Sequence, residues 1–430
     1  MDIGGAYLRA YMKKQVLVLI NKEESDILVE LYPELAEYRD ESGRLTAEAL
    51  KALYGCIESG KLWYDTLSSK LLANGYIQNP YDQCIFNKIH MQEGVQSTIG
   101  IHVDDCFISC VIPAILESIV EWFAEAFEDL NVTRGSVHQF TGMTLDYTQH
   151  DKLIVTMKNQ IDNLMERTGS KSKAVTPSES DLFVVDTTSP KLDRKRGEEF
   201  HSIVATISYI AKRIKPECLV ATSMLASRVQ DPTEQDWRKL ERLLAYINNT
   251  REIPLCLEMD ISYHVRITAS IDFSHATHGD YRGHTGVYIS LGKGCIQAIS
   301  VKQTINTKSS AETELVAASD GATPVINVQN IILSQGLQCE PAIIHQDNQS
   351  TLAMLEKGHA TGPTSRHINI RYFWLSDRIN SGEVQVRYVE SENMTADALT
   401  KQLLGNLFYK HRKTLLNITA QTTCIEGCVE

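Results

Sequence analysis

The chain has 430 residues, of which 43% are hydrophobic and 22% are charged. It contains no low-complexity tract and no internal repeat, and its length suggests about three domains, each able to form its own core. The formal net charge of −12 argues against a protein that binds phosphates over its whole surface. Contacts with nucleic acid are therefore expected on local basic faces, and the acidic balance suits an enzyme that holds cationic metals.

Neither a membrane span nor a secretory signal is expected. No apolar run approaches the roughly 18 residues of a membrane helix, and Met1 is followed at once by Asp2 and glycines rather than by a signal peptide. The ten cysteines are scattered and form no CxxC pair. We interpret them as free thiols in a reducing compartment rather than as zinc ligands or disulfides. The sequence thus predicts an intracellular protein with no membrane partner.

Two adjacent acids interrupt an apolar, strand-like segment near the N-terminus. In residues 100–109 (GIHVDDCFIS), Asp104 and Asp105 lie between β-prone residues. Carboxylates are rarely buried without partners, because an isolated charge in a dry setting is costly. Two interpretations are open. The doublet is either the tip of a tight hairpin that presents both acids to a divalent metal, or a polar turn between two buried strands.

The middle of the chain changes character twice. Residues 169–199 are rich in Ser, Thr, Pro and charge, which predicts a linker or a long surface loop. A second change falls near 250–265, where helical periodicity gives way to strands. Helical patterns between them are expected at about 199–214, 217–229 and 233–249.

The third helical pattern has a defined start and two faces. Thr233 and Asp236 resemble a capping box. An apolar stripe at helical spacing predicts a buried face, made of Trp237, Leu240, Leu244 and Ile247. Lys239, Arg242 and Tyr246 lie on another face, which either contacts a nucleic-acid backbone or, the favoured interpretation, is a solvated face.

The last third of the chain predicts a mixed α/β domain of about 140 residues. Three successive strands are followed by alternating helices and strands. The expected strands are 267–276, 285–291, 295–301, 342–347 and 384–389. The expected helices begin at about 310, follow the fourth strand, span 365–380, and end at about 404.

Four acids stand at the ends of these elements. They are Asp272 ending the first strand, Glu314 early in the first helix, Asp347 ending the fourth strand and Asp397 in the last helix. Acids at strand ends and helix starts can converge on one point, as a two-metal phosphodiester site requires.

Glu312 competes with Glu314 for the role in the first helix. Ser309 and Glu312 match a capping box, in which the glutamate reaches back to the start of the helix. Glu314 lies further inside the helix and is followed by small residues that allow close packing. We therefore assign Glu314 to metal and Glu312 to the cap.

Taken together and in order, the motifs resemble the C-terminal part of a copia-type retrotransposon polyprotein, in which reverse transcriptase is joined to ribonuclease H. The polymerase-like segments are MDIGGAYL (1–8), ALYGCIESGKLWY (52–64), VDD (103–105) and FTGMTLDY (140–147). The nuclease-like segments are KSSAETELVA (308–317), QDNQSTLAML (346–355), SRHINIRYFWL (365–375) and MTADALTK (394–401).

The resemblance implies an α+β chain with four parts. A reverse-transcriptase palm with partial fingers would span 1–172, and a linker with a helical thumb or connection 173–262. A ribonuclease H-like domain, a mixed five-stranded sheet with flanking helices, would span 263–404, and a C-terminal tail 405–430. The implied location is the cytoplasm, within a retroelement particle, or the nucleus.

For the polymerase, the resemblance implies a catalytic set of Asp2, Asp104 and Asp105 that holds two Mg²⁺ ions, with Mn²⁺ as an alternative. An RNA template, a DNA primer and a deoxynucleoside triphosphate would be its partners. The nucleotide-binding segment would be Gly4, Gly5, Ala6 and Tyr7. Its glycines and alanine leave room for backbone N–H groups to approach phosphates. Tyr7 would exclude a ribose 2′-OH, and its competing interpretation is a core aromatic.

For the nuclease, the resemblance implies that Asp272, Glu314, Asp347 and Asp397 bind two metals and cut the RNA strand of an RNA–DNA hybrid. A stripe of basic and aromatic residues is a candidate nucleic-acid-binding face, made of His367, Arg371, Trp374 and Arg378. A solvated basic face explains this stripe equally well. Other parts of a retroelement polyprotein are expected partners.

Several positions depart from the family pattern. The sequence starts at the first polymerase aspartate, His102 precedes Val-Asp-Asp, and Glu58 replaces a glutamine. The loop before Asp397 lacks a histidine. We expect a folded but impaired polymerase half and an intact nuclease half. Two alternatives are a degraded remnant that at most binds nucleic acid, and an unrelated metal-dependent nuclease of the ribonuclease H superfamily fused to a helical module.

Overall fold

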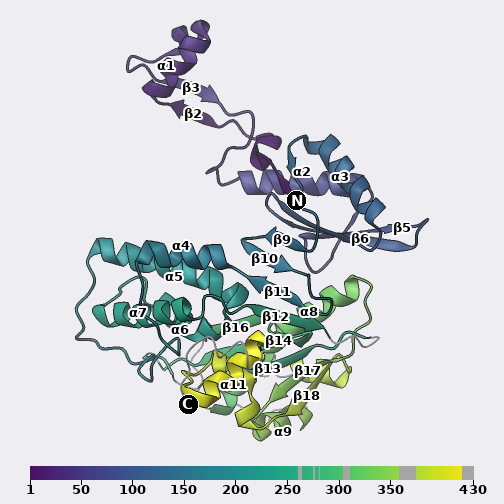
Figure 1. Cartoon of the computed structure of the whole chain (residues 1–430), viewed down its shortest axis with the longest axis vertical. Coiled ribbons are helices and arrows are strands. Elements are labelled where there is room, and N and C mark those ends of the chain that lie inside the picture. Colours follow the sequence, from purple (N-terminus) through teal and green to yellow (C-terminus); the bar gives the residue numbers. More distant parts are fainter. Residues whose placement is uncertain (260–263, 275–276, 280, 304–309, 358–373, 419–430) are drawn as a thin grey trace. The chain divides into compact units, whose positions relative to one another are not determined.

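The computed structural model of the chain (Figure 1) describes residues 1–259, 264–274, 277–279, 281–303, 310–357 and 374–418. The chain divides into two compact units, Met1–Arg134 and Gly135–Glu430. The boundary predicted at residue 172 falls inside the second unit, because strand β11 (Leu153–Thr156) pairs with β12 (Leu255–Met259) across the linker.

The first unit is built on a six-stranded antiparallel sheet in the order β4-β5-β6-β7-β1-β8. Its strands are β1 (Asp2–Ile3), β4 (Ile77–Gln78), β5 (Ile85–His90), β6 (Val95–His102), β7 (Asp105–Cys110) and β8 (Leu130–Asn131). Helices α2 (Ser59–Ala73) and α3 (Pro113–Phe127) close its core around the fully buried Trp63 and Phe123. A short 3₁₀ helix, η1 (Ala6–Arg9), follows β1.

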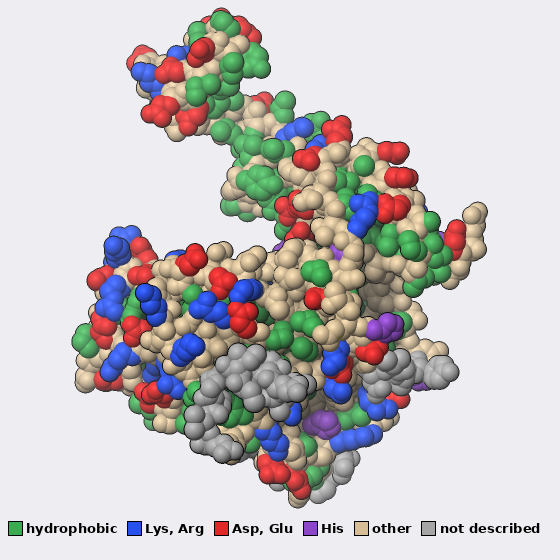
Figure 2. Space-filling view, viewed as in Figure 1, with side chains coloured by type: hydrophobic (Ala, Val, Ile, Leu, Met, Phe, Trp, Pro, Cys, Tyr) green, Lys and Arg blue, Asp and Glu red, His purple; other side chains and the backbone are tan. Residues whose placement is uncertain are grey.

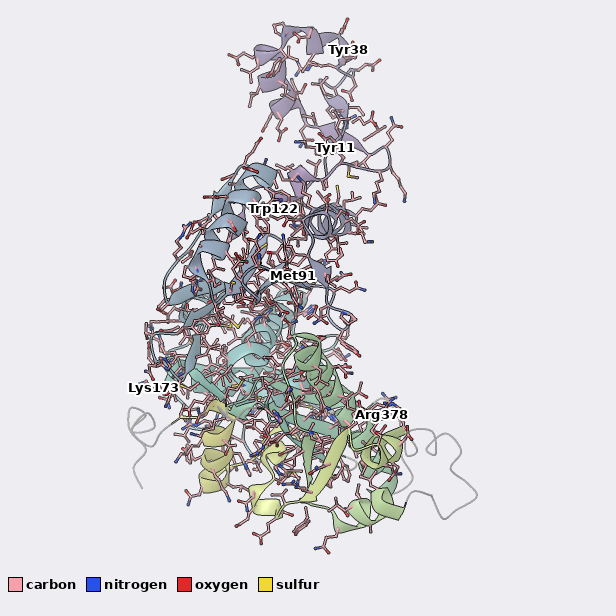
Figure 3. All side chains as sticks on the ribbon, turned by 90° about the vertical axis from the view of Figure 1, so that its right-hand side faces the viewer. Tyr11, Tyr38, Met91, Trp122, Lys173 and Arg378 are labelled. Atoms are coloured by element: carbon pink, nitrogen blue, oxygen red, sulfur yellow. The ribbon has the colours of Figure 1, made fainter. Side chains whose placement is uncertain are left out.

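A smaller lobe of the first unit leaves large apolar side chains in solvent. It consists of β2 (Leu17–Ile20), α1 (Lys22–Leu31), η2 (Pro33–Tyr38) and β3 (Leu45–Glu48). Leu17, Leu31 and Tyr38 are each more than half exposed, and Figure 2 shows the hydrophobic side chains on this lobe. Tyr38, labelled in Figure 3, lies on its outer surface.

The second unit contains two sheets and a group of helices. One sheet has the order β15-β12-β11-β10-β9, where β9 is Val137–Phe140, β10 is Met143–Asp146 and β15 is Gly292–Lys293. The helices are α4 (Lys158–Thr168), α5 (Arg194–Ile214), η3 (Pro216–Cys218), α6 (Leu219–Ala226) and α7 (Glu234–Asn249). The capping box predicted for α7 is confirmed.

The second face predicted on α7 is largely covered by other parts of the chain, although the side chain of Arg242 stays 31% exposed. Lys239 donates hydrogen bonds to the carbonyls of Leu182 and Val184, which belong to the predicted linker. Arg242 donates to the Thr176 carbonyl. Tyr246 is fully buried. The favoured interpretation of a solvated face is therefore wrong for Lys239, because the linker folds over it and supplies backbone acceptors that helical periodicity does not reveal.

The other sheet is the mixed five-stranded one that the sequence predicts, in the order β16-β14-β13-β17-β18. Its strands are β13 (Thr268–Ser274), β14 (His284–Ser290), β16 (Gln297–Lys302), β17 (Ala342–Gln346) and β18 (Val384–Tyr388). The first three are antiparallel, whereas β17 runs parallel to both β13 and β18. Helices α8 (Ser310–Ser334) and α9 (Gln349–Lys357) pack against the sheet. The predicted α+β fold class is thus confirmed.

The end of the chain differs from the prediction. The expected helix to about 404 is replaced by two 3₁₀ helices, η4 (Ser391–Asn393) and η5 (Thr395–Leu399). The expected tail begins with α11 (Gly405–Leu416), whose Phe408, Arg412 and Leu415 are buried at helical spacing. Among the described residues, every helix is too short or too polar to cross a membrane.

Candidate active sites

The acidic doublet lies at a tight hairpin in the first unit. His102 at the end of β6 pairs with Asp105 at the start of β7, so Val103 and Asp104 form a two-residue turn. On the other side of β7, Asp105 pairs with Asp2 of β1. The register of three strands therefore places the three predicted polymerase acids next to one another.

Electrostatics at this hairpin agree with the proximity. The pKa of Asp2 is raised, chiefly by burial and then by the negative charges of Asp104 and Asp105. The three carboxylates do not, however, approach as closely as those of the second site described below.

The hairpin turn is backbone-strained. Val103 has φ +57°, a left-handed conformation that is unfavourable for a β-branched residue. Its carbonyl accepts a hydrogen bond of 2.6 Å from the indole Nε1 of Trp63 on α2. Because Trp63 is fully buried, the packing of α2 fixes the turn that carries Asp104.

The segment after Asp2 has a structural reason for its glycine. The amide of Gly4 donates to the carbonyl of Asp129 at 2.9 Å. A Cβ at position 4 would lie 2.0 Å from Oδ2 of Asp129, so any other residue requires the Asp129 side chain to move. The predicted approach of a phosphate to the amide of Gly4 thus meets an amide that already has a partner in the chain. Gly5 has φ +61°, and Ala6 is fully buried at the start of η1.

Tyr7 is in ring contact with a second tyrosine, Tyr54, on which the acids act electrostatically. The ring centroids of Tyr7 and Tyr54 are 4.7 Å apart. The pKa of Tyr54 is raised by burial and then by the charge of Asp104. Glu58, which replaces the family's glutamine, forms an ion pair with Lys14 at 3.1 Å, so its charge is partly neutralised.

The second site lies in the mixed sheet. Ser270 of β13 pairs with His345 of β17, so Asp272 and Asp347 stand two residues further along adjacent parallel strands. Asp397 comes from η5, which contacts both β13 and β14. Oxygen atoms of the three carboxylates lie within 4.8 Å of one another. In the described part of the chain, this is the one such group of three acidic, His or Cys side chains.

For the fourth predicted acid, Glu314, the structure describes the position of the backbone but not that of the side chain. Glu314 lies on α8, and the structure does not describe its side chain or that of Glu312. Ser309, the predicted N-cap, lies outside the described residues. Helix α8 packs closely on β13, because a Cβ on Gly321 would lie 2.8 Å from Cγ2 of Ile271, the neighbour of Asp272. The choice of Glu314 over Glu312 stays a prediction.

Three polar side chains that the sequence analysis missed surround the carboxylates. The ammonium of Lys401 lies 2.7 Å from Oδ1 of Asp397 and 3.4 Å from Oδ2 of Asp272. The hydroxyl of Thr400 donates to Asp272, and that of Ser391 donates to Asp347 at 2.8 Å. Lys401 is four residues after Asp397, a spacing that could have indicated an ion pair.

Burial makes Asp272 a weaker acid than an exposed aspartate. Its pKa is raised to about 7, chiefly by burial. Lys401 opposes this shift, whereas the charge of Asp397 adds to it. A cation bound beside this carboxyl group would stabilise its ionised form and so lower its pKa.

A glycine in β14 lets η5 reach the site. Gly286 pairs with Asp272 in the sheet. A Cβ on Gly286 would lie 2.7 Å from Cγ2 of Thr400 and 2.9 Å from the carbonyl oxygen of Ala396. The absence of a side chain thus allows η5, with Asp397, to lie directly on the sheet. Glycine inside a strand often marks such a close backbone approach, which is the signal that the sequence analysis did not use.

The predicted nucleic-acid stripe is only partly described. His367 and Arg371 lie outside the described residues. Arg378, labelled in Figure 3, forms an ion pair with Glu383 at 2.9 Å and lies 5.9 Å from the ring centroid of Trp374. Trp374 packs against the core of the sheet. The two described members of the stripe are therefore neighbours, with Trp374 directed inward.

The donor chemistry of the second site fits a hard divalent cation. Carboxylate oxygens are the ligands that Mg²⁺ and Mn²⁺ prefer, and Asp272, Asp347 and Asp397 offer them from three separate elements. The partial exposure of Asp347 leaves a side from which a phosphate group can approach.

Comparison with known proteins agrees with the motifs. No family model matches the chain. Over 393 residues it is 22% identical to the retrovirus-related Pol polyprotein from transposon TNT 1-94 of Nicotiana tabacum, covering 89% of this chain and 29% of that protein. It is 24% identical over 384 residues to the Pol polyprotein from transposon RE2 of Arabidopsis thaliana, covering 87% and 25%. It is 21% identical over 422 residues to the Ty1-GR2 Gag-Pol polyprotein of Saccharomyces cerevisiae, covering 94% and 23%.

The resemblance to transposon Pol polyproteins is thus confirmed, and the chain spans less than a third of the length of each of these relatives. Among solved structures, the foamy viral protease-reverse transcriptase in complex with an RNA/DNA hybrid has a TM-score of 0.45 at 14% identity, covering 91% of this chain and 46% of that one. RNase H1 from Halobacterium salinarum has a TM-score of 0.23 at 16% identity, covering 31% and 94%. Because these TM-scores are low, the description of the fold rests on the strand order given above and not on these structures.

Proposed function

We propose that the mixed-sheet domain is a ribonuclease H, which hydrolyses the RNA strand of RNA–DNA hybrids by two-metal catalysis. The observation that supports it best is the convergence of Asp272, Asp347 and Asp397 within 4.8 Å. Three acids from separate elements are costly to hold together, because their charges repel one another in a partly dry site. Such an arrangement is expected where divalent cations are bound for chemistry.

The chain's own residues would prepare this site for the reaction. When bound, Mg²⁺ or Mn²⁺ would lower the pKa of a water and stabilise charge on the scissile phosphate. Asp272, Asp347 and Asp397 would hold the metals, with Glu314 as the proposed fourth ligand. The hydroxyl groups of Thr400 and Ser391 fix the orientation of Asp272 and Asp347, so the carboxylates need little rearrangement.

For the first unit we propose RNA-directed DNA polymerase chemistry by the same two-metal principle, with Asp2, Asp104 and Asp105 as ligands. The pairing of Asp2 with Asp105 and the position of Asp104 in the adjoining turn support it. Tyr7 would face the sugar of the incoming nucleotide. An RNA template, a DNA primer, deoxynucleoside triphosphates and other parts of a retroelement polyprotein are the proposed partners.

We propose that polymerase activity is weaker than nuclease activity in this chain. The three acids of the hairpin do not converge as those of the second site do. The Gly4 amide is occupied by Asp129, and Glu58 places a carboxylate where the family carries a neutral amide. Robust templated extension of a primer by the purified chain would overturn this.

The nuclease proposal is tested with the full chain and a labelled RNA–DNA hybrid in Mg²⁺. The wild type is expected to cut the RNA strand, and Asp397→Asn and Glu314→Gln are each expected to lower the rate by at least about a hundredfold. Asp377→Asn is the matched control, because Asp377 is an exposed acid in the helical segment 374–380 and is not part of the carboxylate cluster.

A folded wild type that cuts no hybrid in either Mg²⁺ or Mn²⁺ would favour the inactive remnant instead. Equal loss of cleavage in Asp377→Asn would also count against the assignment, because the effect would then not be specific to the carboxylate cluster.

A further inference from the structure

A lysine side chain contacts two of the three carboxylates of the second acidic site. The Nζ atom of Lys401 lies 2.7 Å from Oδ1 of Asp397 and 3.4 Å from Oδ2 of Asp272. These are two of the three carboxylates that converge there. Asp397, Thr400 and Lys401 come from a single turn of chain, so the same local backbone supplies a ligand, a hydroxyl donor and a cation.

The ammonium and a metal ion compete for the same oxygen atoms. An ammonium binds a carboxylate at about 2.7–2.9 Å and Mg²⁺ at about 2.1 Å, so either cation must lie within a short distance of the same carboxylates. Two cations held that close would repel each other strongly in a buried setting. Simultaneous binding to both Asp272 and Asp397 is therefore unfavourable.

Lys401 is able to leave. Its side chain is 41% exposed, whereas those of Asp272 and Asp397 are 6% and 10% exposed. The four-carbon stem of a lysine can turn its ammonium into solvent while the backbone stays in place. The acids are thus fixed and the lysine is the movable member of the cluster.

We propose that Lys401 is a built-in counter-ion that competes with divalent metal for Asp272 and Asp397, so that metal binding displaces it. The inference rests on the proposed function only in that the site is taken to bind a divalent metal. Without metal, the ammonium holds the carboxylates together. With metal, it swings out. Lys401 is thereby a positioning residue that sets the metal concentration at which the site fills.

The test is the binding of Mn²⁺ to the full chain, measured by calorimetry and by electron paramagnetic resonance. Lys401→Met keeps the length of the side chain and removes its charge. We expect it to lower the Mn²⁺ dissociation constant about fivefold to tenfold without changing the number of ions bound. Lys401→Arg keeps the charge and is expected to bind Mn²⁺ no more tightly than the wild type.

Two further variants assign the effect to this site. Lys410→Met is the matched control, because Lys410 is a nearby lysine whose ammonium contacts Asn393 and no carboxylate of the cluster. It should bind Mn²⁺ like the wild type. Asp397→Asn should remove the binding signal that Lys401→Met strengthens. Circular dichroism checks the fold, and Lys401→Gln replaces the methionine variant if that one fails to fold.

Three results would overturn the inference. They are an unchanged dissociation constant in Lys401→Met, no binding by either protein, and the appearance of an additional bound ion in the variant. The last result would mean that the lysine stands in permanently for one metal. Hybrid cleavage is measured separately. Tighter Mn²⁺ binding without any cleavage would defeat the ribonuclease H proposal and leave the competition intact, and cleavage with unchanged affinity would do the reverse.

Discussion

The two acidic sites of this chain are built by different means. At the hairpin, Asp104 and Asp105 are adjacent in sequence, and strand register brings Asp2 beside them. In the mixed sheet, Asp272 and Asp397 are far apart in sequence and meet because η5 packs on β13 and β14. The doublet of the first site is thus a local feature on a strained turn, which strand pairing joins to Asp2, whereas the second site is a product of tertiary packing.

The two sites also differ in the contacts that stabilise their neighbouring negative charges. In the second site, Lys401, Thr400 and Ser391 contact the carboxylates directly. At the hairpin, a hydrogen bond from Trp63 to the backbone carbonyl of Val103 fixes the turn that carries Asp104. We therefore expect the second site to be more sensitive to changes in packing, and the first to changes in turn geometry.

The largest expected effect is on the buried polar cluster that attaches α11 to the helices of the second unit. Arg412 is 1% exposed and lies 3.5 Å from the Tyr246 hydroxyl. Its positive charge favours the ionised form of the fully buried Glu217. Arg412→Met should destabilise the second unit by about 3–5 kcal/mol, because Glu217 loses a compensating charge. Chemical denaturation followed by hydrogen exchange and mass spectrometry would assign the loss to each unit.

The control for this change is an exposed arginine in an ion pair. Arg194 pairs with Glu198, and both side chains are mostly exposed. Arg194→Met should change the free energy of unfolding by at most about 1 kcal/mol. A loss below that value in Arg412→Met as well would mean that α11 is not needed to hold the second unit together.

Substitution of one glycine in each sheet tests whether the mixed sheet of the second unit is more closely packed than the sheet of the first unit. Gly286→Ala should destabilise the second unit by about 1–3 kcal/mol, because its Cβ would lie under 3 Å from Thr400 and Ala396. It should also slow hybrid cleavage by moving Asp397. In the first sheet, a Cβ on Gly100 meets its nearest neighbour at 3.9 Å, so Gly100→Ala should stay within about 0.5 kcal/mol of the wild type. Equal effects in the two variants would remove this distinction.

The raised pKa of Asp272 predicts a pH dependence of stability. Because the folded-state pKa is raised from 3.8 to about 7, the protonated form is favoured by folding. The stability that this contributes is fully present below pH 3.8 and is lost as the pH rises through about 7. In EDTA, the wild type should therefore lose on the order of 3 kcal/mol relative to Asp272→Asn between pH 4.5 and pH 8.

The comparison with Asp272→Asn isolates this one group. Burial lowers the pKa of His284 to about 3, which acts in the opposite direction at low pH but is common to both proteins. Thermal melts at the two pH values measure the difference, and added Mg²⁺ should remove it by stabilising the ionised carboxylate. The same difference at both pH values would contradict the assignment of the raised pKa to Asp272.

The contrast between the sites also explains what could be predicted from sequence. The doublet, the α7 capping box and the positions of the five strands along the chain depend on neighbouring residues or on periodicity, and all three are present in the structure. Lys401 and Gly286 matter only because η5 lies on β14, a contact that no local pattern specifies. The packing of the predicted linker on Lys239 is hidden for the same reason.

The smallest expected effect concerns the strained turn of the first site. Val103 is held at φ +57°, which costs a β-branched residue about 1–3 kcal/mol. Glycine adopts this conformation without strain but has more freedom to lose on folding, about 0.5–1 kcal/mol. Val103→Gly should therefore stabilise the first unit by up to about 1 kcal/mol and leave the second unit unchanged.

Hydrogen exchange of β6 and β7 peptides, measured by mass spectrometry, reports the stability of this hairpin within the full chain. Slower exchange in Val103→Gly would show that the strain is intrinsic to the turn. Faster exchange would mean that the valine side chain contributes more through contacts than its backbone loses. Since Asp104 follows directly in the turn, that outcome would mean that contacts of the Val103 side chain, together with the Trp63 hydrogen bond, hold the turn that carries Asp104.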